Sequence, residues 1–375
     1  MWKIVFPGIA MIGITYAFAR YSFGLFLPEI SKTLQLTESQ AGYVGFAAYA
    51  AYTLALLSSP LLIKHFSARK AVLLSGLTAM AGMLGMAGAQ GFITLFISAF
   101  VAGTGSGWIS PAFSQVAAAS FSRQQQEKGN TWINTGTSFG LVFTGVVAVI
   151  FPEHWRWSYV MFAVLAFLVY QWNAAIVEEK RVPAVKKTQR VPLRKLLLQA
   201  RWMISASAGI GFISAVYWTF SRSYLTIVHG MSSHESIMFW MVMGSAGIIG
   251  GIAGGVIRFL GLHRSYQWGT LTLTISLIAL TVPSFPSIYI SGILFGISFI
   301  FMTGLFIVWG TRQFPSFPSL GVSISFFSLG MGQAAGSLAA GRLIESFSYP
   351  AAFILFSIAG CFLLLMKTTI LQNRR

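Results

Sequence analysis

The sequence contains no aspartate, a single cysteine and few charged residues of any kind. Charged side chains make up 9% of the 375 residues, whereas a soluble domain carries about 25%. Cys361 has no second cysteine with which to form an intrachain disulfide. The sequence also lacks a metal-ligand cluster, a catalytic triad and a phosphate-binding loop, and an enzyme needs catalytic groups that converge on one site. We therefore expect neither an enzyme nor a cofactor.

Apolar residues dominate what is present. Hydrophobic residues make up 55% of the chain, which is too much to bury in one water-soluble core, so we expect lipid to be the solvent. The net charge of +17 could indicate binding to nucleic acid, but the basic residues form short clusters between long apolar runs. That distribution is typical of the cytoplasmic loops of a membrane protein. We therefore expect a lipid bilayer, and no nucleic acid, as a partner.

Twelve apolar segments are long enough to span a bilayer as helices, which takes about 20 mostly apolar residues. They are too long for the strands of a membrane barrel and do not alternate in polarity. The segments cover residues 4–28, 39–62, 70–90, 92–118, 130–151, 156–177, 202–227, 236–257, 266–284, 287–311, 320–343 and 350–370. We predict an all-α membrane protein with twelve transmembrane helices in two pseudo-symmetric six-helix bundles.

Lysine and arginine gather on one side of these segments, which predicts the orientation of the chain. Most of the 25 basic residues fall in loops on the side of the N-terminus, and such loops stay in the cytoplasm. The opposite side collects the glutamates Glu29, Glu38, Glu153, Glu235 and Glu345. We therefore expect a multi-pass protein of the bacterial inner membrane with both termini in the cytoplasm.

The longest polar stretch divides the chain into two halves with equal numbers of helices. Residues 178–201 hold a basic, proline-containing sequence that we interpret as a cytoplasmic linker. The part from residue 192 to 198 reads either as a short basic amphipathic helix on the anionic inner leaflet or as a loop whose charge only sets the topology. This gives an N-terminal bundle at 1–177 and a C-terminal bundle at 202–375.

The two halves repeat each other in sequence. A shift of 202 residues (222 − 20 and 218 − 16) places Arg20 on Arg222 and Tyr16 on Trp218. Glycines of the fifth and eleventh segments also match at a constant offset. Parallel repeats about an axis along the membrane normal are found in transporters, whose site lies near the midplane between the repeats.

Twelve helices, a basic central loop and the two repeats resemble the major facilitator superfamily along the whole chain. The family motif G-x-L-A-D-R-x-G-R-R lies between helices two and three, where residues 61–70 here read LLIKHFSARK with His65 at the acidic position. Residues 332–342 resemble the small-residue eleventh helix of many members. Residues 17–21 resemble a bacterial branch labelled YbfB/YjiJ-like. The resemblance implies a transporter, and the missing acid removes the carboxylate of the family's inner latch.

Arg20 and Arg222 are the residues that best indicate a site. An arginine at a helix centre costs about 2.5–3.5 kcal/mol to insert, so an ionisable residue in a span is by default a functional hypothesis. Each arginine follows an aromatic residue, Tyr16 or Trp218, by one turn on the same helix face. No internal carboxylate is evident, and two unpaired guanidinium groups in one cavity suit a carboxylate or phosphate, which each can bind through two hydrogen bonds.

The paired arginines also resemble those of organophosphate/phosphate exchangers in the superfamily, which implies an anionic substrate. The alternative is that both side chains extend to the outer headgroups and only anchor their helices. Asn134 and Gln333 are secondary candidates for the substrate path, although amides in membrane bundles often only join helices. Glu29, at an outer helix end, is the fallback site for a coupling proton.

The leading hypothesis is a secondary transporter of a small organic solute, expected to be anionic, that works as a monomer by rocker-switch alternating access. Drug or metabolite efflux is the first alternative and predicts an apolar cavity from which the arginines turn away. A membrane sensor that transports nothing is the second. We expect the partners to be a small-molecule substrate and the lipid bilayer.

Overall fold

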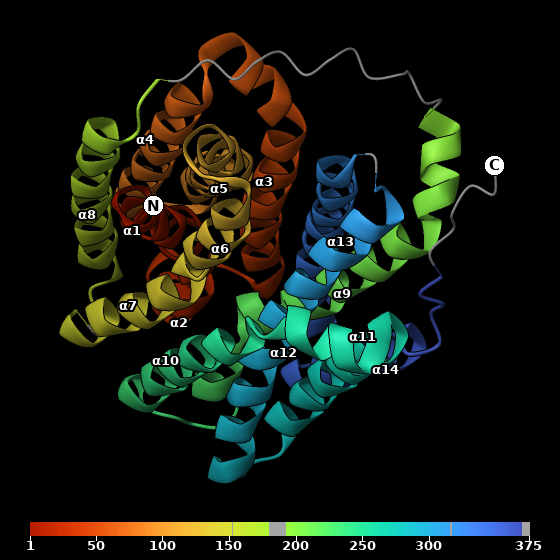
Figure 1. Cartoon of the computed structure of the whole chain (residues 1–375). Coiled ribbons are helices and arrows are strands. Elements are labelled where there is room, and N and C mark those ends of the chain that lie inside the picture. Colours follow the sequence, from red (N-terminus) through yellow and green to blue (C-terminus); the bar gives the residue numbers. More distant parts are fainter. Residues whose placement is uncertain (152, 180–192, 316, 370–375) are drawn as a thin grey trace.

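The computed structural model describes residues 1–151, 153–179, 193–315 and 317–369, and within them it contains helices and no strand. Figure 1 shows that the first half of the chain and the second half form two helical bundles side by side. Within these residues the predicted all-α fold with twelve helical units is confirmed. In the first bundle, two of the units are interrupted helices rather than single ones.

The first bundle has six units, because α1, η1 and α2 form one run and α6 and α7 form another. Its elements are α1 (Trp2–Ile12), the π-helix η1 (Gly13–Tyr21), α2 (Ser22–Leu34), α3 (Glu38–Phe66), α4 (Ala68–Ala87), α5 (Phe92–Ser120), α6 (Arg123–Asn134), α7 (Gly136–Ile150) and α8 (Trp155–Ile176).

The second bundle has six helices. They are α9 (Leu193–Ile227), α10 (Ser233–Gly250), α11 (Ala253–Thr281), α12 (Phe285–Gln313), α13 (Pro318–Ser346) and α14 (Tyr349–Leu363). The amphipathic part of the predicted linker is the beginning of α9, whereas residues 180–192 lie outside the described residues.

Not every unit is strongly apolar along its whole length. In the described residues, eight helices are long and apolar enough to cross a membrane, and a ninth is added if α10 and α11, which meet at 72°, form one broken span. α14 is apolar but shorter. α13 is rich in small and polar residues, and it packs against α3 of the first bundle and against α9 and α12 of the second.

The same backbone turn recurs in both halves. Ser67 joins α3 to α4 with φ 81° and ψ 160°, and Gly261 breaks α11 with φ 79° and ψ 164°. Glycine adopts this region readily, whereas a serine there is strained. Ser67 uses its side chain to accept a hydrogen bond from the Lys70 amide at the start of α4. Gly261 therefore lies between the end of the predicted segment 236–257, most of which is α10, and the start of the segment 266–284, which is the second part of α11.

Capping side chains define where helices start at the end opposite the α3–α4 connection. Thr37 and Gln40 satisfy each other's backbone amides at the start of α3. Ser232 and Glu235 form the same capping box at the start of α10. Both boxes supply acceptors to amides that a helix leaves unpaired in its first turn.

At this same end the two bundles pack closely through small residues. A Cβ atom on Gly42 of α3 would lie 2.7 Å from the Ser337 carbonyl oxygen of α13, and the Ser337 hydroxyl donates to the Gly42 carbonyl over 3.0 Å. A Cβ atom on Gly24 of α2 would lie 1.9 Å from the Trp218 carbonyl oxygen of α9. Glycine at these positions brings the helix backbones of the two halves into contact and closes this end.

Candidate functional site

A cavity of about 2370 Å³ lies between the two bundles. Its deep wall includes Tyr16, Arg20 and Tyr21 of the run that begins at the N-terminus, and helices of both halves contribute. The lining continues to the α3–α4 connection, where Lys64 and Lys70 border it. The cavity therefore leads from the middle of the first helix to the end of the molecule that carries this connection.

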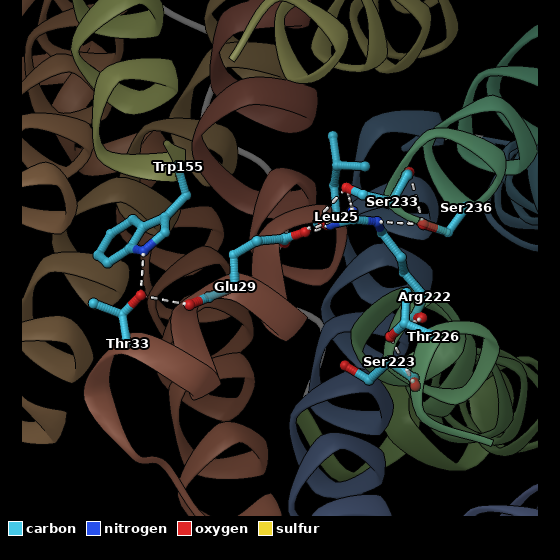
Figure 2. Close-up of polar contacts among 9 residues, drawn as sticks. All are labelled: Leu25, Glu29, Thr33, Trp155, Arg222, Ser223, Thr226, Ser233 and Ser236. Carbon is cyan, nitrogen blue, oxygen red and sulfur yellow. Dashed lines mark hydrogen bonds and ion pairs between the residues drawn. The ribbon is translucent and has the colours of Figure 1, made fainter. Parts of the chain in front are cut away.

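An ion pair between the bundles lies at the opposite end (Figure 2). Arg222 of α9 reaches Glu29 of α2 through two hydrogen bonds, Nη1 to Oε2 at 2.5 Å and Nη2 to Oε1 at 2.7 Å. Nη1 also donates to the Leu25 carbonyl, Nε to the Ser236 hydroxyl at 3.1 Å and Nη2 to the Ser233 hydroxyl at 2.9 Å. An arginine has five N–H donors, so all of them are used. We call these five residues the interbundle latch.

The latch corrects the expectation that no carboxylate neutralises Arg222. That arginine is 1% exposed and pairs with Glu29, which is 16% exposed. It is not among the residues that line the large cavity. The reason is tertiary: α2 meets α9 at Gly24, and this contact places Glu29, five residues later, beside Arg222.

Arg20 lies in a different setting. Four tyrosine rings surround its guanidinium carbon, at 4.8 Å for Tyr16, 4.4 Å for Tyr21, 5.6 Å for Tyr49 and 4.3 Å for Tyr52. Aromatic faces attract a cation through their quadrupoles, more strongly where water is excluded. We call these four residues the tyrosine cluster.

The π-helix explains how Tyr21 joins this cluster. In an α-helix, residues three and four apart share a face, so Tyr16 and Arg20 would align while Tyr21 would turn away. The i to i+5 pattern of a π-helix brings residues five apart together, and η1 spans all three residues. Short π-helical insertions often occur at functional sites.

Arg20 has unused hydrogen-bonding capacity. It is 5% exposed, its Nη2 donates to the Tyr21 hydroxyl, and its Nε and Nη1 are buried without a partner. Within the described ranges, Glu29 forms an ion pair with Arg222, and no carboxylate forms one with Arg20. A buried charge with unmet donors is costly, so this group is able to bind an anion from the cavity.

Tyr21 also connects Arg20 to the second bundle. Its ring stacks on that of Trp218, with centroids 4.2 Å apart and planes inclined by 25°. Trp218 is buried against Phe295 and Phe299, and it does not line the cavity. Tyr16 does line it and shares a hydrogen bond with the Ser110 hydroxyl at 3.2 Å.

The two amide candidates lie in different places. Asn134, at the end of α6, is exposed in the cavity wall, and its side chain donates to the Asn130 carbonyl at 2.9 Å. Gln333 of α13 is fully buried outside the cavity lining, and neither side-chain amide atom has a partner. Asn134 is therefore placed to contact a solute in this conformation, and Gln333 is not.

Sequence reasoning missed much of the polar lining. Hydroxyl and amide side chains on α5, α6 and α7 border the cavity: Ser110, Ser114, Asn130, Thr131, Thr137 and Ser138. Ser110 and Ser114 stand four residues apart, and so do Asn130, Asn134 and Ser138. Rows of polar residues at that spacing along an apolar helix mark one face, and this is the signal that could have identified the wall.

The charges along the lining are mostly positive. Arg20 lies deepest, Lys64 and Lys70 stand at the mouth with His65, and Glu179 is the acidic residue among the lining side chains described. A cleft lined by one sign of charge raises the local concentration of ions of the opposite sign. The cavity as a whole thus favours anions over cations.

A family model described as Major Facilitator Superfamily matches residues 9–317. No curated relative matches the chain by sequence.

Several solved structures are similar along nearly the whole chain. A D-xylose–proton symporter is 13% identical, with a TM-score of 0.80, over 99% of this chain and 99% of that chain. A mutant of the nucleoside transporter NupG is 12% identical, with a TM-score of 0.79, over 96% and 98%. A bacterial homologue of the human lysosomal transporter Spinster, inward-facing and occupied, is 14% identical, with a TM-score of 0.76, over 96% and 94%. At these identities the likeness shows the fold alone.

Proposed function

The chain belongs to the major facilitator superfamily of secondary transporters, not to an enzyme family, and we propose that it carries a small organic anion by alternating access. The observation that carries this proposal is Arg20. Its guanidinium is buried in the cavity wall, and two of its three nitrogens have no partner in the protein. Both nitrogens are shielded from the cavity in this conformation, so a side chain of the tyrosine cluster must move aside for an entering carboxylate to accept a charge-assisted hydrogen bond, the strong kind, from them.

The cavity and the latch together define one state of the transport cycle. If the basic α3–α4 connection lies in the cytoplasm, as the positive-inside rule predicts, the cavity opens inward and the latch closes the outer end. In the outward-open state α2 and α9 must separate, and the Glu29 carboxylate then leaves the Arg222 guanidinium.

Glu29 is the candidate for energy coupling. A proton on its carboxylate would remove the negative charge and weaken both hydrogen bonds to Arg222, so protonation would favour opening of the outer end. Replacement of Glu29 by Gln would then abolish a response of transport to a pH gradient while leaving anion binding at Arg20. Exchange without a proton is the alternative if the response persists.

Membrane, topology and assembly are part of the same proposal. We place the protein in the bacterial inner membrane as a monomer with both termini in the cytoplasm, because the basic residues cluster on the side of Lys64 and Lys70. The motif at residues 17–21, which includes Arg20, supports membership of the YbfB/YjiJ-like branch.

Efflux of an apolar compound is the second candidate function. Leu56, Leu57, Phe326 and Phe327 line part of the cavity, which an apolar solute would suit. Arg20 decides against it, because the efflux hypothesis predicts an arginine turned away from the cavity and this one forms part of its wall.

The test is uptake into proteoliposomes of a ¹⁴C-labelled organic-acid fraction. Arg20→Lys keeps the positive charge but loses the planar guanidinium, which can bind a carboxylate through two hydrogen bonds. Loss of one hydrogen bond to a charged group costs about 1.5–3 kcal/mol, or roughly ten- to a hundredfold in affinity. The matched control is Arg258→Lys, because Arg258 is exposed and lies outside the cavity lining. Equal uptake by wild type and Arg20→Lys at matched protein levels would refute the proposal.

A further inference from the structure

Three charged side chains lie in the interior between the bundles, Arg222 with Glu29 in the latch and Arg20 in the cavity wall. Arg20 and Arg222 are the charged residues among the buried side chains described, and Glu29 is the carboxylate that pairs with Arg222. Arginine stays protonated in proteins, so with Glu29 ionised this group carries two positive charges and one negative charge. Its sum is +1.

The two equivalent arginines are neutralised unequally. The shift of 202 residues that relates Arg20 to Arg222 takes Glu29 to Met231 (29 + 202), which has no charge. Arg222 uses all of its donors on chain groups, whereas Arg20 leaves Nε and Nη1 without a partner. The chain thus supplies an anion to one arginine and leaves the other without one.

We propose that the substrate is a monoanion, an organic monocarboxylate, which gives Arg20 the negative charge that Glu29 gives Arg222. This rests on the proposed function. Alternating access passes through a state in which the site is shut from water on both sides, and an uncompensated charge there is heavily penalised by desolvation. A monoanion brings the sum to zero, while a dianion leaves −1 and a neutral solute leaves +1.

The net charge of these three side chains is the same whichever end of the protein is open. Opening the outer end separates Glu29 from Arg222 but changes neither charge, so the sum of the group stays at +1. It changes only if Glu29 takes up a proton, and that proton is then carried as a second transported charge.

The geometry around Arg20 favours a carboxylate over a phosphate. Four tyrosine rings lie within 5.6 Å of its guanidinium carbon, and the Tyr21 hydroxyl accepts from one of the two N–H groups of Nη2. The other N–H of Nη2 points the same way as Nε–H or as one N–H of Nη1, so the donors that remain suit the two oxygens of one carboxylate. A phosphate monoester presents three acceptor oxygens and more than one negative charge at neutral pH, and the described lining offers no second cation at this depth.

The first arm of the experiment compares anions that differ in charge. Purified full-length protein in nanodiscs is titrated calorimetrically at pH 7.5 with three pairs: benzoate and phthalate, butyrate and succinate, phenylacetate and phenyl phosphate. We expect the monoanion of at least one pair to bind about tenfold or more tightly than its doubly charged partner. Arg20→Gln should abolish that binding, and the exposed-site control Arg258→Gln should retain it.

The second arm changes the charge of the site. Glu29→Gln raises the sum to +2, so the preference should move about tenfold or more toward the dianions. Glu29→Gln combined with Arg222→Gln returns the sum to +1 and should restore the preference for monoanions. Because the double variant removes Arg222 together with its carboxylate partner, it tests the inference even if Glu29→Gln alone does not fold.

The outcomes separate the inference from the proposed function. Dianions that bind as tightly as monoanions, and lose binding in Arg20→Gln, would overturn the monoanion inference and leave anion transport standing. A double variant without the monoanion preference would also overturn it. Absence of Arg20-dependent binding for all six compounds would refute both.

Discussion

Replacement of Glu29 by Gln should open the end of the protein that the interbundle latch closes. Gln keeps the shape of the side chain and one acceptor oxygen but loses the charge and the second acceptor for Arg222. Arg222 is 1% exposed, so in the closed state its charge would remain buried without an ionic partner. In the opposite state the same arginine is hydrated, and the substitution costs little there.

The size of the effect follows from the geometry. Removing one partner of a buried ion pair costs about 3–5 kcal/mol. Glu29 is 16% exposed and the substituted amide retains one hydrogen bond, so we expect about 2–3 kcal/mol, which lies within the range for a hydrogen bond to a charged group. This moves the equilibrium between the two states roughly 30- to 150-fold toward outer opening.

Labelling of a single cysteine measures that equilibrium. Thr219→Cys in a Cys361→Ser background places a thiol where Thr219 lies buried beside Ser337 of α13. A membrane-impermeant maleimide added outside should react slowly in this background and much faster once Glu29→Gln is added. Glu153→Gln, an exposed position with the same charge change, is the control. Equal labelling rates with and without the Glu29→Gln substitution would refute the role of the ion pair in closing this end.

Three other outcomes are expected. Gly24→Ala should lower thermal stability by about 1–3 kcal/mol and speed the same labelling, because a Cβ there would lie 1.9 Å from the Trp218 carbonyl oxygen; normal stability and labelling would contradict the close contact. Asn173→Ala should cost about 1–2 kcal/mol in a thermal melt, since its buried amide donates to a carbonyl of α1 at 3.0 Å, and an unchanged melt would count against that bond. Reporter fusions after Ser67 and after Gln90 should report cytoplasm and outside respectively, and the reverse would invert the topology.

Composition and spacing were sufficient to predict the helices and their repeat. A run of about 20 apolar residues has few alternatives in a bilayer, so the spans follow from hydropathy and the breaks from turn residues. The equivalence of Arg20 and Arg222 also follows from sequence, because a constant offset is a one-dimensional property. Both arginines are buried, as their positions inside apolar runs indicated.

The partners of the two arginines could not be predicted in the same way. Glu29 and Arg222 are 193 residues apart, and their contact depends on the packing of α2 against α9 at Gly24. A helix-end carboxylate reads as solvent-exposed until that packing is known. The π-helical register of η1 could not be predicted from the sequence either, since the residues of a π-helix have no distinct apolar period. Tyr21 therefore joined the site only when the structure showed its hydrogen-bond pattern.

The central claim, that Arg20 holds the substrate anion, is tested most directly by locating a bound anion. A crystal of the protein soaked with 4-iodobenzoate gives an anomalous signal at the iodine. We predict the carboxylate on Nε or Nη1 of Arg20 and the iodine in the cavity beside the ring of Tyr16 or Tyr52. Iodine found only at the mouth beside Lys64 and Lys70, or at Arg222 with Glu29 displaced, would contradict the account.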